Sequence, residues 1–441
     1  MSNQSILRIT RELGEIQRGS DLSLAVACRD IDVRHVRALI IGPPDTPYEF
    51  GFFEFTVKFT RDYPTKAPSV TAITTNSGRT RFNPNIYAGG RVCLSILGTW
   101  RGERGEEWSS AQGLESILIS IQSLMSQNPY ENEPGFEDAK TDYDKKNQDA
   151  YVAKIRHETL RISVIERLED YLGINRGKTP GAVTVYNAEE DYQSGAAEAP
   201  FEPFKDLCKR RFLWYYESYI ASIDEEMKKH KDDDRFEKMP FEGPGNTMEG
   251  TFQYTSLKAR IQTIFEKLNE EAHSWAADGQ QAVLKEMSIA SNLQRQFEQT
   301  VEKYKKNDAV TLDLDLVDKN PFVWQLVLFG RPMTNLDGGV FRILLYLSPK
   351  FPDVLPRVKF ETPIFHHRVS PHGIVCYNPV RKDDMGSHLD AIIEAIEEES
   401  PAYDPRTLVN PEAAKLFWGQ QDDKKIYNRK LRRSVQDSAE F

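Results

Sequence analysis

The sequence predicts an α+β fold in which a four-stranded antiparallel meander with flanking helices is present twice, with a helical segment between the copies. Short strand-forming runs separated by turn residues occur near both ends of the 441-residue chain. Apolar residues recur at helical spacing beside each set of strands, and the middle of the chain has helical stripes alone. We therefore expect domains at residues 1–172 and 282–441, joined by a helical linker or extension at 173–281.

The first domain is expected to begin with a helix from Ile6 to Arg18, where apolar residues recur at helical spacing and a glycine follows. From Leu22 to Ile73 three or four strands alternate, with turns between them. Proline cannot donate a hydrogen bond to a neighbouring strand, so Pro64 and Pro68 should end this meander and lead the chain away from the sheet.

Four helices are expected between residues 114 and 275. An apolar helix at 114–126 should pack on the sheet, and a helical run at 142–172 should end at the glycine that follows. Residues 173–200 are rich in Gly, Ala and Glu and are interpreted as a linker or an ordered surface segment. Apolar and aromatic stripes at 203–231 and 256–275 are typical of helices that face a core.

The end of the chain repeats the spacing of its beginning. Equal distances separate Gly42 from Gly51 and Gly330 from Gly339 (nine residues), Gly51 from Pro64 and Gly339 from Pro352 (thirteen), and Phe82 from Cys93 and Phe365 from Cys376 (eleven). Helices expected at 282–305, 389–399 and 411–434 accompany these positions. Coincident spacings of this kind indicate a second copy of the same fold.

Composition excludes several classes of protein. Hydrophobic residues make up 39% of the chain, which is enough to fill real cores, and the net charge of −10 argues against nucleic acid or an anionic membrane as the main partner. No apolar run approaches 18 residues, so we expect an intracellular protein of the cytoplasm, the nucleus or both. The four cysteines are far apart and have no CxxC spacing, so neither a disulfide framework nor a metal site is expected, and no cofactor.

The most informative stretch is NPNIYAGGRVCLSIL, at residues 83–97. It places Cys93 eight positions after Asn85 in a region rich in turn residues, where a large partner can reach a thiol. The alternative is that Cys93 is a small buried hydrophobic residue. The stretch resembles the active-site signature of ubiquitin-conjugating enzymes, in which His-Pro-Asn, seven residues and then Cys-Leu follow one another; Asn83 stands at the histidine position.

Three further segments support this resemblance. The turn GPPDTPY at 42–48, the YPTKAP segment at 63–68 and the WSSA loop at 108–111 resemble motifs of that family and occur in the family's order. The long Z-type subgroup is the most similar, because SILGTW at 95–100, NPYENEPGFE at 128–137 and KIRHET at 154–159 resemble that subgroup in particular. The resemblance covers about residues 1–172 and implies the UBC fold.

The resemblance also implies a reaction. Cys93 would accept ubiquitin or a ubiquitin-like modifier from an activating enzyme as a thioester, and then pass it to a substrate lysine or to a ligase cysteine. Asn85 is the candidate donor to the oxyanion formed during transfer, with a purely turn-fixing role as the alternative. Tyr130 or Glu131, in the loop after the second helix, is the candidate for orienting the incoming lysine.

Two surfaces for protein partners follow from the same resemblance. The activating enzyme is expected to meet basic residues of the first helix, although a solvated polar face is the alternative. These residues are Arg8, Arg11 and Arg18. The ligase surface is expected at Thr65, Lys66, Trp108 and Ser110. Family members often have an aromatic residue at the position of Thr65 and a proline at that of Ser110, so this chain departs from the usual ligase contacts.

The second copy departs from the signature where the chemistry takes place. Arg368 stands eight residues before Cys376 in place of asparagine, and His367 replaces the proline. We therefore expect a non-catalytic second domain, with Cys376 as a second candidate thiol. A metal site at the nearby histidines is disfavoured because no framework of carboxylates or thiolates accompanies them.

Two other hypotheses remain open. One is a catalytically inactive scaffold that uses two UBC folds to bind partners of the ubiquitin pathway. The other has both cysteines active, and it predicts that Cys376 accepts the modifier when Cys93 is absent.

Overall fold

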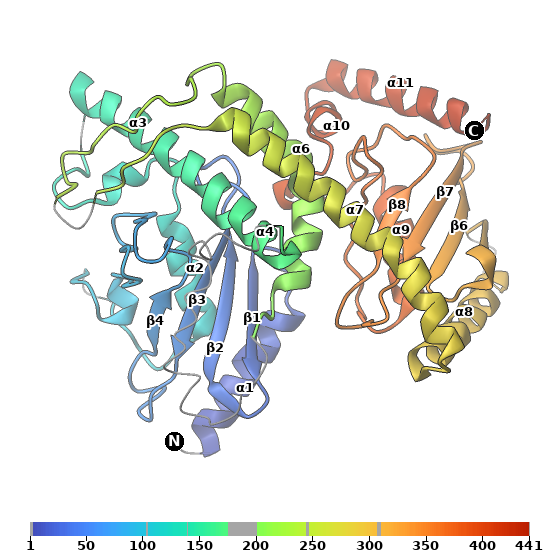
Figure 1. Ribbon diagram of the computed structural model, residues 1–441, viewed down its shortest axis with the longest axis horizontal. Coiled ribbons are helices and arrows are strands. Elements are labelled where there is room, and N and C mark those ends of the chain that lie inside the picture. The colour runs from blue at the N-terminus through green and yellow to red at the C-terminus, as the bar shows by residue number, and fades with distance from the viewer. Residues whose placement is uncertain are drawn as a thin grey trace. The chain divides into compact units, whose positions relative to one another are not determined.

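The computed structural model describes residues 3–102, 105–138, 140–174, 201–243, 247–306 and 310–440. The chain divides into two compact units, with unit 1 comprising residues 1–208 and 223–261 and unit 2 comprising residues 209–222 and 262–441. Each unit contains a four-stranded antiparallel sheet with neighbouring helices, as Figure 1 shows with β1–β4 in blue and β6–β8 in orange. The predicted α+β class and the internal repeat are thus confirmed. The expected linker at 173–200 lies almost entirely outside the described residues.

Unit 1 follows the predicted order of elements. Its elements are α1 (Asn3–Arg18), β1 (Leu24–Arg29), β2 (Asp32–Ile41), β3 (Phe52–Lys58), β4 (Ser69–Ala72), the 3-10 turns η1 (Ser95–Leu97) and η2 (Pro129–Asn132), α2 (Leu114–Leu124), α3 (Asp142–Glu158), the π-helical stretch η3 (Thr159–Glu166) and α4 (Arg167–Leu172). Gly173 closes α4 in the left-handed conformation, as expected of a C-terminal cap.

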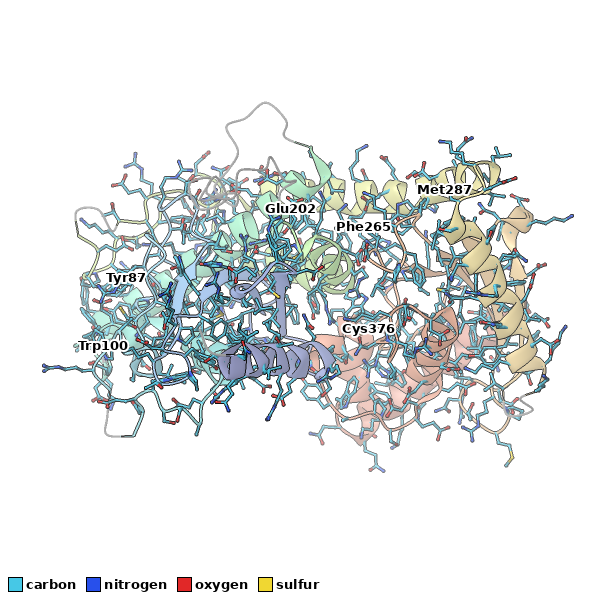
Figure 2. The ribbon with its side chains drawn as sticks, turned by 90° about the horizontal axis from the view of Figure 1, so that it is seen from below. Tyr87, Trp100, Glu202, Phe265, Met287 and Cys376 are labelled. Carbon is cyan, nitrogen blue, oxygen red and sulfur yellow. The ribbon has the colours of Figure 1, made fainter. Side chains whose placement is uncertain are left out.

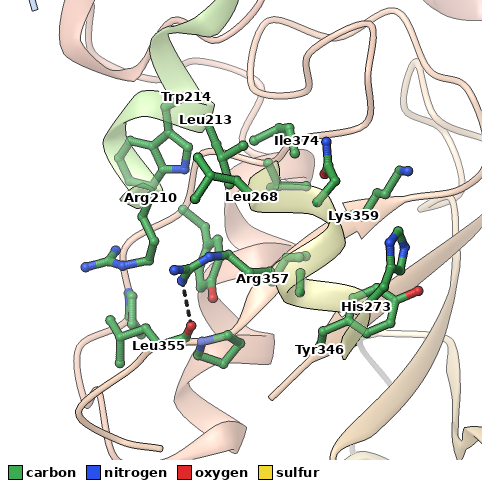
Figure 3. Close-up of a pocket in the computed structure, with 17 residues that line it drawn as sticks. Arg210, Leu213, Trp214, Leu268, His273, Tyr346, Leu355, Arg357, Lys359 and Ile374 are labelled. Atoms are coloured by element: carbon green, nitrogen blue, oxygen red, sulfur yellow. Dashed lines mark hydrogen bonds between the residues drawn. The ribbon is translucent and has the colours of Figure 1, made fainter. Parts of the chain in front are cut away.

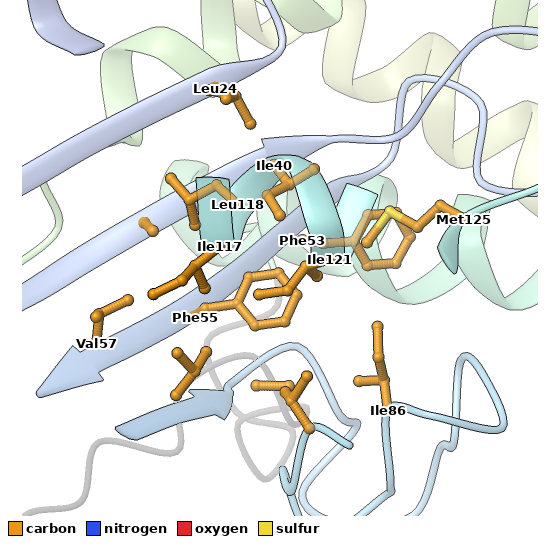
Figure 4. Packing of buried hydrophobic residues seen from close by; sticks show 14 of the residues in the cluster. Leu24, Ile40, Phe53, Phe55, Val57, Ile86, Ile117, Leu118, Ile121 and Met125 are labelled. Carbon is orange, nitrogen blue, oxygen red and sulfur yellow. The ribbon is translucent and has the colours of Figure 1, made fainter. Parts of the chain in front are cut away.

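The sheet of unit 1 is a simple meander. Its strand order is β1-β2-β3-β4, and Phe55 in β3 lies opposite Ala38 on one side and Ala72 on the other. Alternate residues of each strand face the same side of the sheet, and the apolar face is covered by α2. Figure 4 shows Ile117 and Ile121 of α2 directed at the apolar residues of the strands, and both are fully buried.

Residues 233–252, which we call the strap, also belong to unit 1. Backbone hydrogen bonds from Asp233 N–H to the Phe252 oxygen and from Phe236 N–H to the Gly250 oxygen pair its two ends. Met239 and Met248 are buried in the hydrophobic core of unit 1. The strap follows α6 (Lys205–Glu226) and precedes α7 (Tyr254–Leu284).

Unit 2 repeats the meander. Its remaining elements are α8 (Ser288–Lys305), β5 (Leu312–Leu316), the 3-10 turns η5 (Val317–Lys319) and η6 (Pro405–Thr407), β6 (Val323–Phe329), β7 (Val340–Tyr346), β8 (Arg357–Phe360), α9 (Met385–Glu397), α10 (Pro411–Phe417) and α11 (Gln421–Ser438). The strand order β5-β6-β7-β8 matches that of unit 1. The turns match as well: Gly42 N–H bonds to the Gly51 oxygen at 2.8 Å, and Gly330 N–H to the Gly339 oxygen at 2.9 Å.

Two predicted helix boundaries are wrong. The helix expected at 282–305 begins only at Ser288, because α7 continues to Leu284 and Glu286 breaks the helix with a φ of +50°. The helix expected at 411–434 is two helices, because Gly419 packs against the start of α11 and Gln420 forms a capping box there with Asp423. Among the described residues no helix is long and apolar enough to span a membrane.

Candidate active site

Cys93 lies at the end of a narrow turn that follows β4. The turn is closed by hydrogen bonds from Tyr87 N–H to the Arg91 oxygen and from Gly90 N–H to the Tyr87 oxygen, both at 2.9 Å. Gly90 has a φ of +89°, and a Cβ there would stand 2.7 Å from the Ala72 oxygen. Only glycine fits such a position, so the Gly-Gly pair of the sequence brings the thiol back to the sheet edge.

Asn85 and Cys93 hold each other through two hydrogen bonds. The Cys93 N–H donates to the Asn85 main-chain oxygen at 2.8 Å, and the Asn85 side-chain amide donates to the Cys93 oxygen at 3.0 Å. Cys93 exposes 4% of its surface. The structure therefore shows a turn-fixing contact of Asn85, whose side-chain amide bonds to the main chain of Cys93.

Asn83 connects this turn to the rest of unit 1. Its side chain is fully buried, donates to the Tyr48 hydroxyl at 3.0 Å and to the Leu124 oxygen at 2.8 Å, and accepts from the Asn85 N–H at 2.9 Å. Since Leu124 ends α2, the asparagine that replaces the signature histidine fastens the cysteine turn to the helix behind it.

The segment after Cys93 is also ordered by side-chain contacts. The Thr99 hydroxyl accepts from the Leu94 N–H at 2.9 Å and donates to the Val92 oxygen at 2.8 Å. The next residue, Trp100, keeps 47% of its surface exposed and lies at the margin of unit 1 in Figure 2. An aromatic side chain is therefore presented to solvent seven residues after the thiol.

The two residues considered for orienting a lysine have opposite environments. Tyr130 is fully buried, with its ring 5.2 Å from Phe136 and 5.4 Å from Phe241 between centroids. An acceptor lysine cannot reach a phenol inside the core, so the prediction for Tyr130 is wrong. Glu131, its neighbour in η2, is exposed and remains a candidate.

Arg81 is a site residue that the sequence did not reveal. Its guanidinium is buried, donates to the Pro84 oxygen at 2.5 Å and to Glu133 at 2.9 Å, and lies 4.5 Å from the centre of the Tyr87 ring. It thereby ties the cysteine turn to the loop after α2. Glu133 is 52 residues away along the chain, so no local pattern indicates the pair.

Comparison with known proteins decides the family. The profile of the family described as ubiquitin-conjugating enzyme matches residues 8–159 and 292–435, one segment in each unit. The chain belongs to the ubiquitin-conjugating enzyme family. It is 38% identical to ubiquitin-conjugating enzyme E2 Z of Xenopus tropicalis over 277 residues, which is 63% of this chain and 76% of that protein. It is also 38% identical to the Homo sapiens protein of that name, over 62% of this chain and 67% of that one.

These matches agree with the resemblance to the Z-type subgroup and identify the chain as a ubiquitin-conjugating enzyme, a transferase. A shorter match, 41% identical over 174 residues, is to probable ubiquitin-conjugating enzyme protein 17 of Caenorhabditis elegans and covers 37% of this chain and 23% of that protein. Membership of the family implies ubiquitin, an activating enzyme and ligases as partners in general terms.

The three arginines of α1 are not equivalent in this conjugating enzyme. Arg8 donates from its three guanidinium nitrogens to Glu12 at 2.8 Å and to the oxygens of Ser110 and Gln112, both at 2.6 Å. Arg11 is exposed and paired with Glu15 at 2.9 Å, and Arg18 is exposed. Arg8 therefore holds the loop at 110–112, whereas the other two face solvent.

The predicted ligase residues come together from two loops. The Trp108 indole N–H donates to the Pro64 oxygen at 2.8 Å, which joins the loop before α2 to the segment that contains Thr65 and Lys66. Thr65, Lys66 and Ser110 are exposed, and Lys66 pairs with Asp62 at 2.7 Å. The hydrogen bond from Trp108 brings the two predicted segments together, and their role in ligase binding stays a prediction.

Unit 2 has a different cysteine environment. The Cys376 N–H donates to the Arg368 oxygen at 3.0 Å, as in the first signature, but the Arg368 guanidinium lies 3.8 Å from the Cys376 sulfur. Burial raises the pKa of Cys376, and Arg368 and Arg211 only partly offset this effect. Cys376, labelled in Figure 2, exposes 2% of its surface. A raised pKa disfavours the thiolate that a nucleophile requires.

A small pocket lies beside this cysteine segment and is shown in Figure 3. It has a volume of about 40 Å³ and is lined by Trp214 of α6, Leu268 of α7 and the apolar residues next to Cys376. A water molecule requires about 10–15 Å³ of such space, so the pocket has room for only a few waters and is too small for an organic cofactor.

The histidines of unit 2 do not converge. His366 and His367 stack with ring centroids 4.3 Å apart, while His372 lies 3.5 Å from Glu217 of α6. Burial lowers the pKa of His366 to about 3 and that of His367 to about 2, so both rings are neutral at physiological pH. Within the described ranges no three His, Cys, Asp or Glu side chains are arranged to bind a metal ion.

Proposed function

We propose that Cys93 carries ubiquitin or a ubiquitin-like modifier as a thioester. The Cys93 thiolate attacks the modifier's C-terminal carbonyl, which the activating enzyme presents as a thioester, and the cysteine of the activating enzyme leaves as a thiolate. A lysine amine of a substrate, or a ligase cysteine, then attacks the new thioester and releases Cys93. The observation that supports this most directly is the pair of hydrogen bonds between Asn85 and Cys93.

Asn85 has a role in each step of this proposal. Before transfer, its amide fixes the Cys93 backbone. During transfer it donates to the oxyanion of the tetrahedral intermediate, and loss of a single donor of this kind costs on the order of 100- to 1000-fold in rate. Exposed Glu131 orients the incoming lysine, since a carboxylate attracts an ammonium and accepts one of its protons.

The surfaces proposed to bind protein partners consist of predicted residues whose side chains are accessible to solvent. Arg11 and Arg18 are the members of the basic set proposed to meet the activating enzyme, because Arg8 is occupied within unit 1. Thr65, Lys66, Trp108 and Ser110 form the proposed ligase surface. The cytoplasm or the nucleus is the proposed location, in keeping with the reduced cysteines of the described chain.

Unit 2 is proposed to be non-catalytic. Arg368 replaces the asparagine of the signature, and the pKa of the adjacent thiol is raised rather than lowered. Unit 1 is proposed to be catalytic and unit 2 to have a supporting role. The residues expected as a helical extension at 173–281 are divided between the two units, since 223–261 belong to unit 1 and 262–281 to unit 2.

The experiment is a charging assay on a non-reducing gel with activating enzyme, ATP and ubiquitin. It compares the wild type with Cys93→Ala and Cys376→Ala, which is the matched control. We expect a band that is sensitive to reducing agent in the wild type and in Cys376→Ala, and none in Cys93→Ala. Residual charging of Cys93→Ala that requires Cys376 would show that unit 2 is active. Absence of charging in the wild type, with every available activating enzyme, would favour the inactive scaffold.

A further inference from the structure

The two units differ at the position occupied by Tyr48 in unit 1. Tyr48 lies six residues after Gly42, is fully buried, and donates its hydroxyl to the Phe82 oxygen at 2.7 Å. The corresponding residue, six after Gly330, is Leu336. The turns themselves match, because Thr46 accepts from the Tyr48 N–H at 3.2 Å and Thr334 from the Leu336 N–H at 3.1 Å. The phenol of unit 1 therefore has no counterpart in unit 2.

A groove of about 560 Å³ lies at this place in unit 2. It is lined by Leu336, by His366 and His367 of the altered signature, and by Phe417 and Tyr427 of the last two helices. This volume is in the range of pockets that bind ligands. Aromatic side chains form one wall of the groove. The His367 ring stacks on the Phe417 ring with centroids 4.2 Å apart, and the Phe417 and Tyr427 ring centroids are 5.0 Å apart.

In unit 1 the equivalent place is filled by the chain itself. Tyr151 and Ile155 of α3 correspond to Tyr427 and Leu431 of α11, because both pairs are buried and four residues apart on the helix that completes the fold. Phe241 of the strap lies 5.5 Å from the Tyr151 ring. The Phe241 ring also lies 5.4 Å from the Tyr130 ring and 5.5 Å from the Phe136 ring, between centroids. Unit 1 thus shows that a chain segment with an aromatic residue in a turn fits this part of the fold.

The groove in unit 2 also contains a polar group that needs a partner. His367 exposes 1% of its surface, and its Nδ1 lies 3.2 Å from the Tyr427 hydroxyl. Within the described part of the chain, its Nε2 has no hydrogen-bond partner. A buried polar atom without a partner costs about 1–3 kcal/mol, so a ligand that bonds to Nε2 recovers this cost.

The charged residues at the rim of the groove restrict which kind of ligand can bind there. Glu397, Glu398 and Glu399 follow one another where α9 ends, and they line the groove. The basic residues in the lining, Lys424 and Arg432, come from α11 instead, and Arg432 is held by Asn335 at 3.0 Å. The end of α9 therefore favours a basic residue in any segment that lies across it.

We propose that this groove binds a segment of a partner protein, whose aromatic side chain packs against the partly exposed rings of Phe417 and Trp418. A basic residue beside the aromatic one meets the three glutamates, and a main-chain group of the segment bonds to His367 Nε2. This inference concerns unit 2 and does not depend on the reaction proposed for Cys93.

The probe for this proposal is a fluorescent peptide that copies residues 234–243 of the strap, DRFEKMPFEG. It contains two phenylalanines, with Arg235 next to the first and Lys238 three residues before the second. Binding to the full chain is measured by fluorescence anisotropy. We expect saturable binding below about 1 mM, and at least about tenfold weaker binding when the phenylalanine at position 241 of the peptide is alanine.

The matched protein variant is Leu336→Tyr, which introduces the side chain that unit 1 has at this position and should fill the groove. It is expected to weaken peptide binding at least about tenfold while Cys93 is charged as in the wild type. Trp418→Ala, which removes a ring from the same groove, tests the proposal independently if the first variant fails to fold.

Three results would overturn the proposal. The first is absence of saturable binding. The second is equal binding by the wild type and both groove variants, which would place the peptide elsewhere, for example on unit 1 in exchange for its own strap. The third is self-association of the chain that Leu336→Tyr abolishes, which would assign the groove to a second copy rather than to a different protein.

Discussion

Replacing Glu242 with glutamine should destabilise unit 1 strongly, because this strap residue neutralises a buried lysine. The Lys154 ammonium is fully buried and lies 2.5 Å from the Glu242 carboxylate. Burial lowers the pKa of Lys154, and the hydrogen bond and charge of Glu242 oppose that shift. The variant keeps the shape of the side chain and removes its charge, so the ammonium is left in the core without its partner.

The expected cost follows from the burial of both groups. Removing one partner of a buried ion pair typically costs about 3–5 kcal/mol, compared with about 0.2–1 kcal/mol for an exposed pair. Unit 1 has fewer than 250 residues, so this loss corresponds to a decrease in melting temperature of roughly 6–20 °C. The double variant Lys154→Met with Glu242→Gln has no unpaired charge and should recover most of the loss.

Calorimetric unfolding gives the melting temperatures, and hydrogen exchange at the amides of β2 and β3 reports on unit 1 separately. Asp62→Asn, which breaks the exposed pair with Lys66, is the matched control and should leave the melting temperature close to that of the wild type, because solvent screens the pair. A cost below about 1 kcal/mol for Glu242→Gln, equal to that of the control, would refute the reasoning.

The pH dependence provides a second test of the same prediction. Without Glu242 the pKa of Lys154 in the folded state falls further below its ordinary value. At a pH between the pKa of Lys154 in the folded state and its ordinary pKa in the unfolded state, the unfolded state binds more protons than the folded state. Stability therefore rises with pH across that range. The rise should begin at lower pH in Glu242→Gln than in the wild type. Identical alkaline profiles would mean that the two side chains are not coupled.

Three further predictions test the signature turns and unit 2. Asn83→Ala removes buried hydrogen bonds to a hydroxyl and to main-chain groups, and should cost about 1–3 kcal/mol for each group left unpaired; a urea midpoint equal to that of the wild type would contradict this. Gly42→Ala should cost more than about 4 kcal/mol, since its Cβ would stand 1.7 Å from a backbone oxygen, whereas Gly89→Ala meets nothing within 4 Å and should have a wild-type melting temperature. The stability of unit 2 should fall as pH drops below 6.5 toward about 3, because the unfolded chain protonates His366 and His367 more readily than the folded unit does. Substituting phenylalanine for His367 should flatten this acid limb, and an unchanged slope would show that the ring is not buried as described.

Much of the fold could be predicted because its signals are local. Helical and strand periodicity, the glycines at turns and the proline pairs are properties of short segments, and their equal spacing in the two halves of the chain is independent of any contact. The order of four strands in each unit follows from these signals. The helix boundaries at 282–288 and 411–421 could not be predicted, because a single residue with positive φ or a cap decides them and the apolar pattern continues across the break.

The same distinction applies to the candidate site. The position of Cys93 eight residues after Asn85 could be recognised from the sequence, because the turn between them is built from neighbouring residues. The burial of Tyr130 could not, since its environment is completed by Phe241, which is 111 residues away along the chain.

Tertiary structure alone decided what each polar side chain has as its partner. Arg8 looks like a solvent-facing residue of an amphipathic helix, yet it holds a loop 102 residues away. The groove in unit 2 is likewise invisible in the sequence, because residues between Met333 and Arg432 line it and come together only in the folded unit. Periodicity determines which face of an element is apolar, whereas contacts between residues remote in sequence determine which buried groups are paired and which cavities stay open.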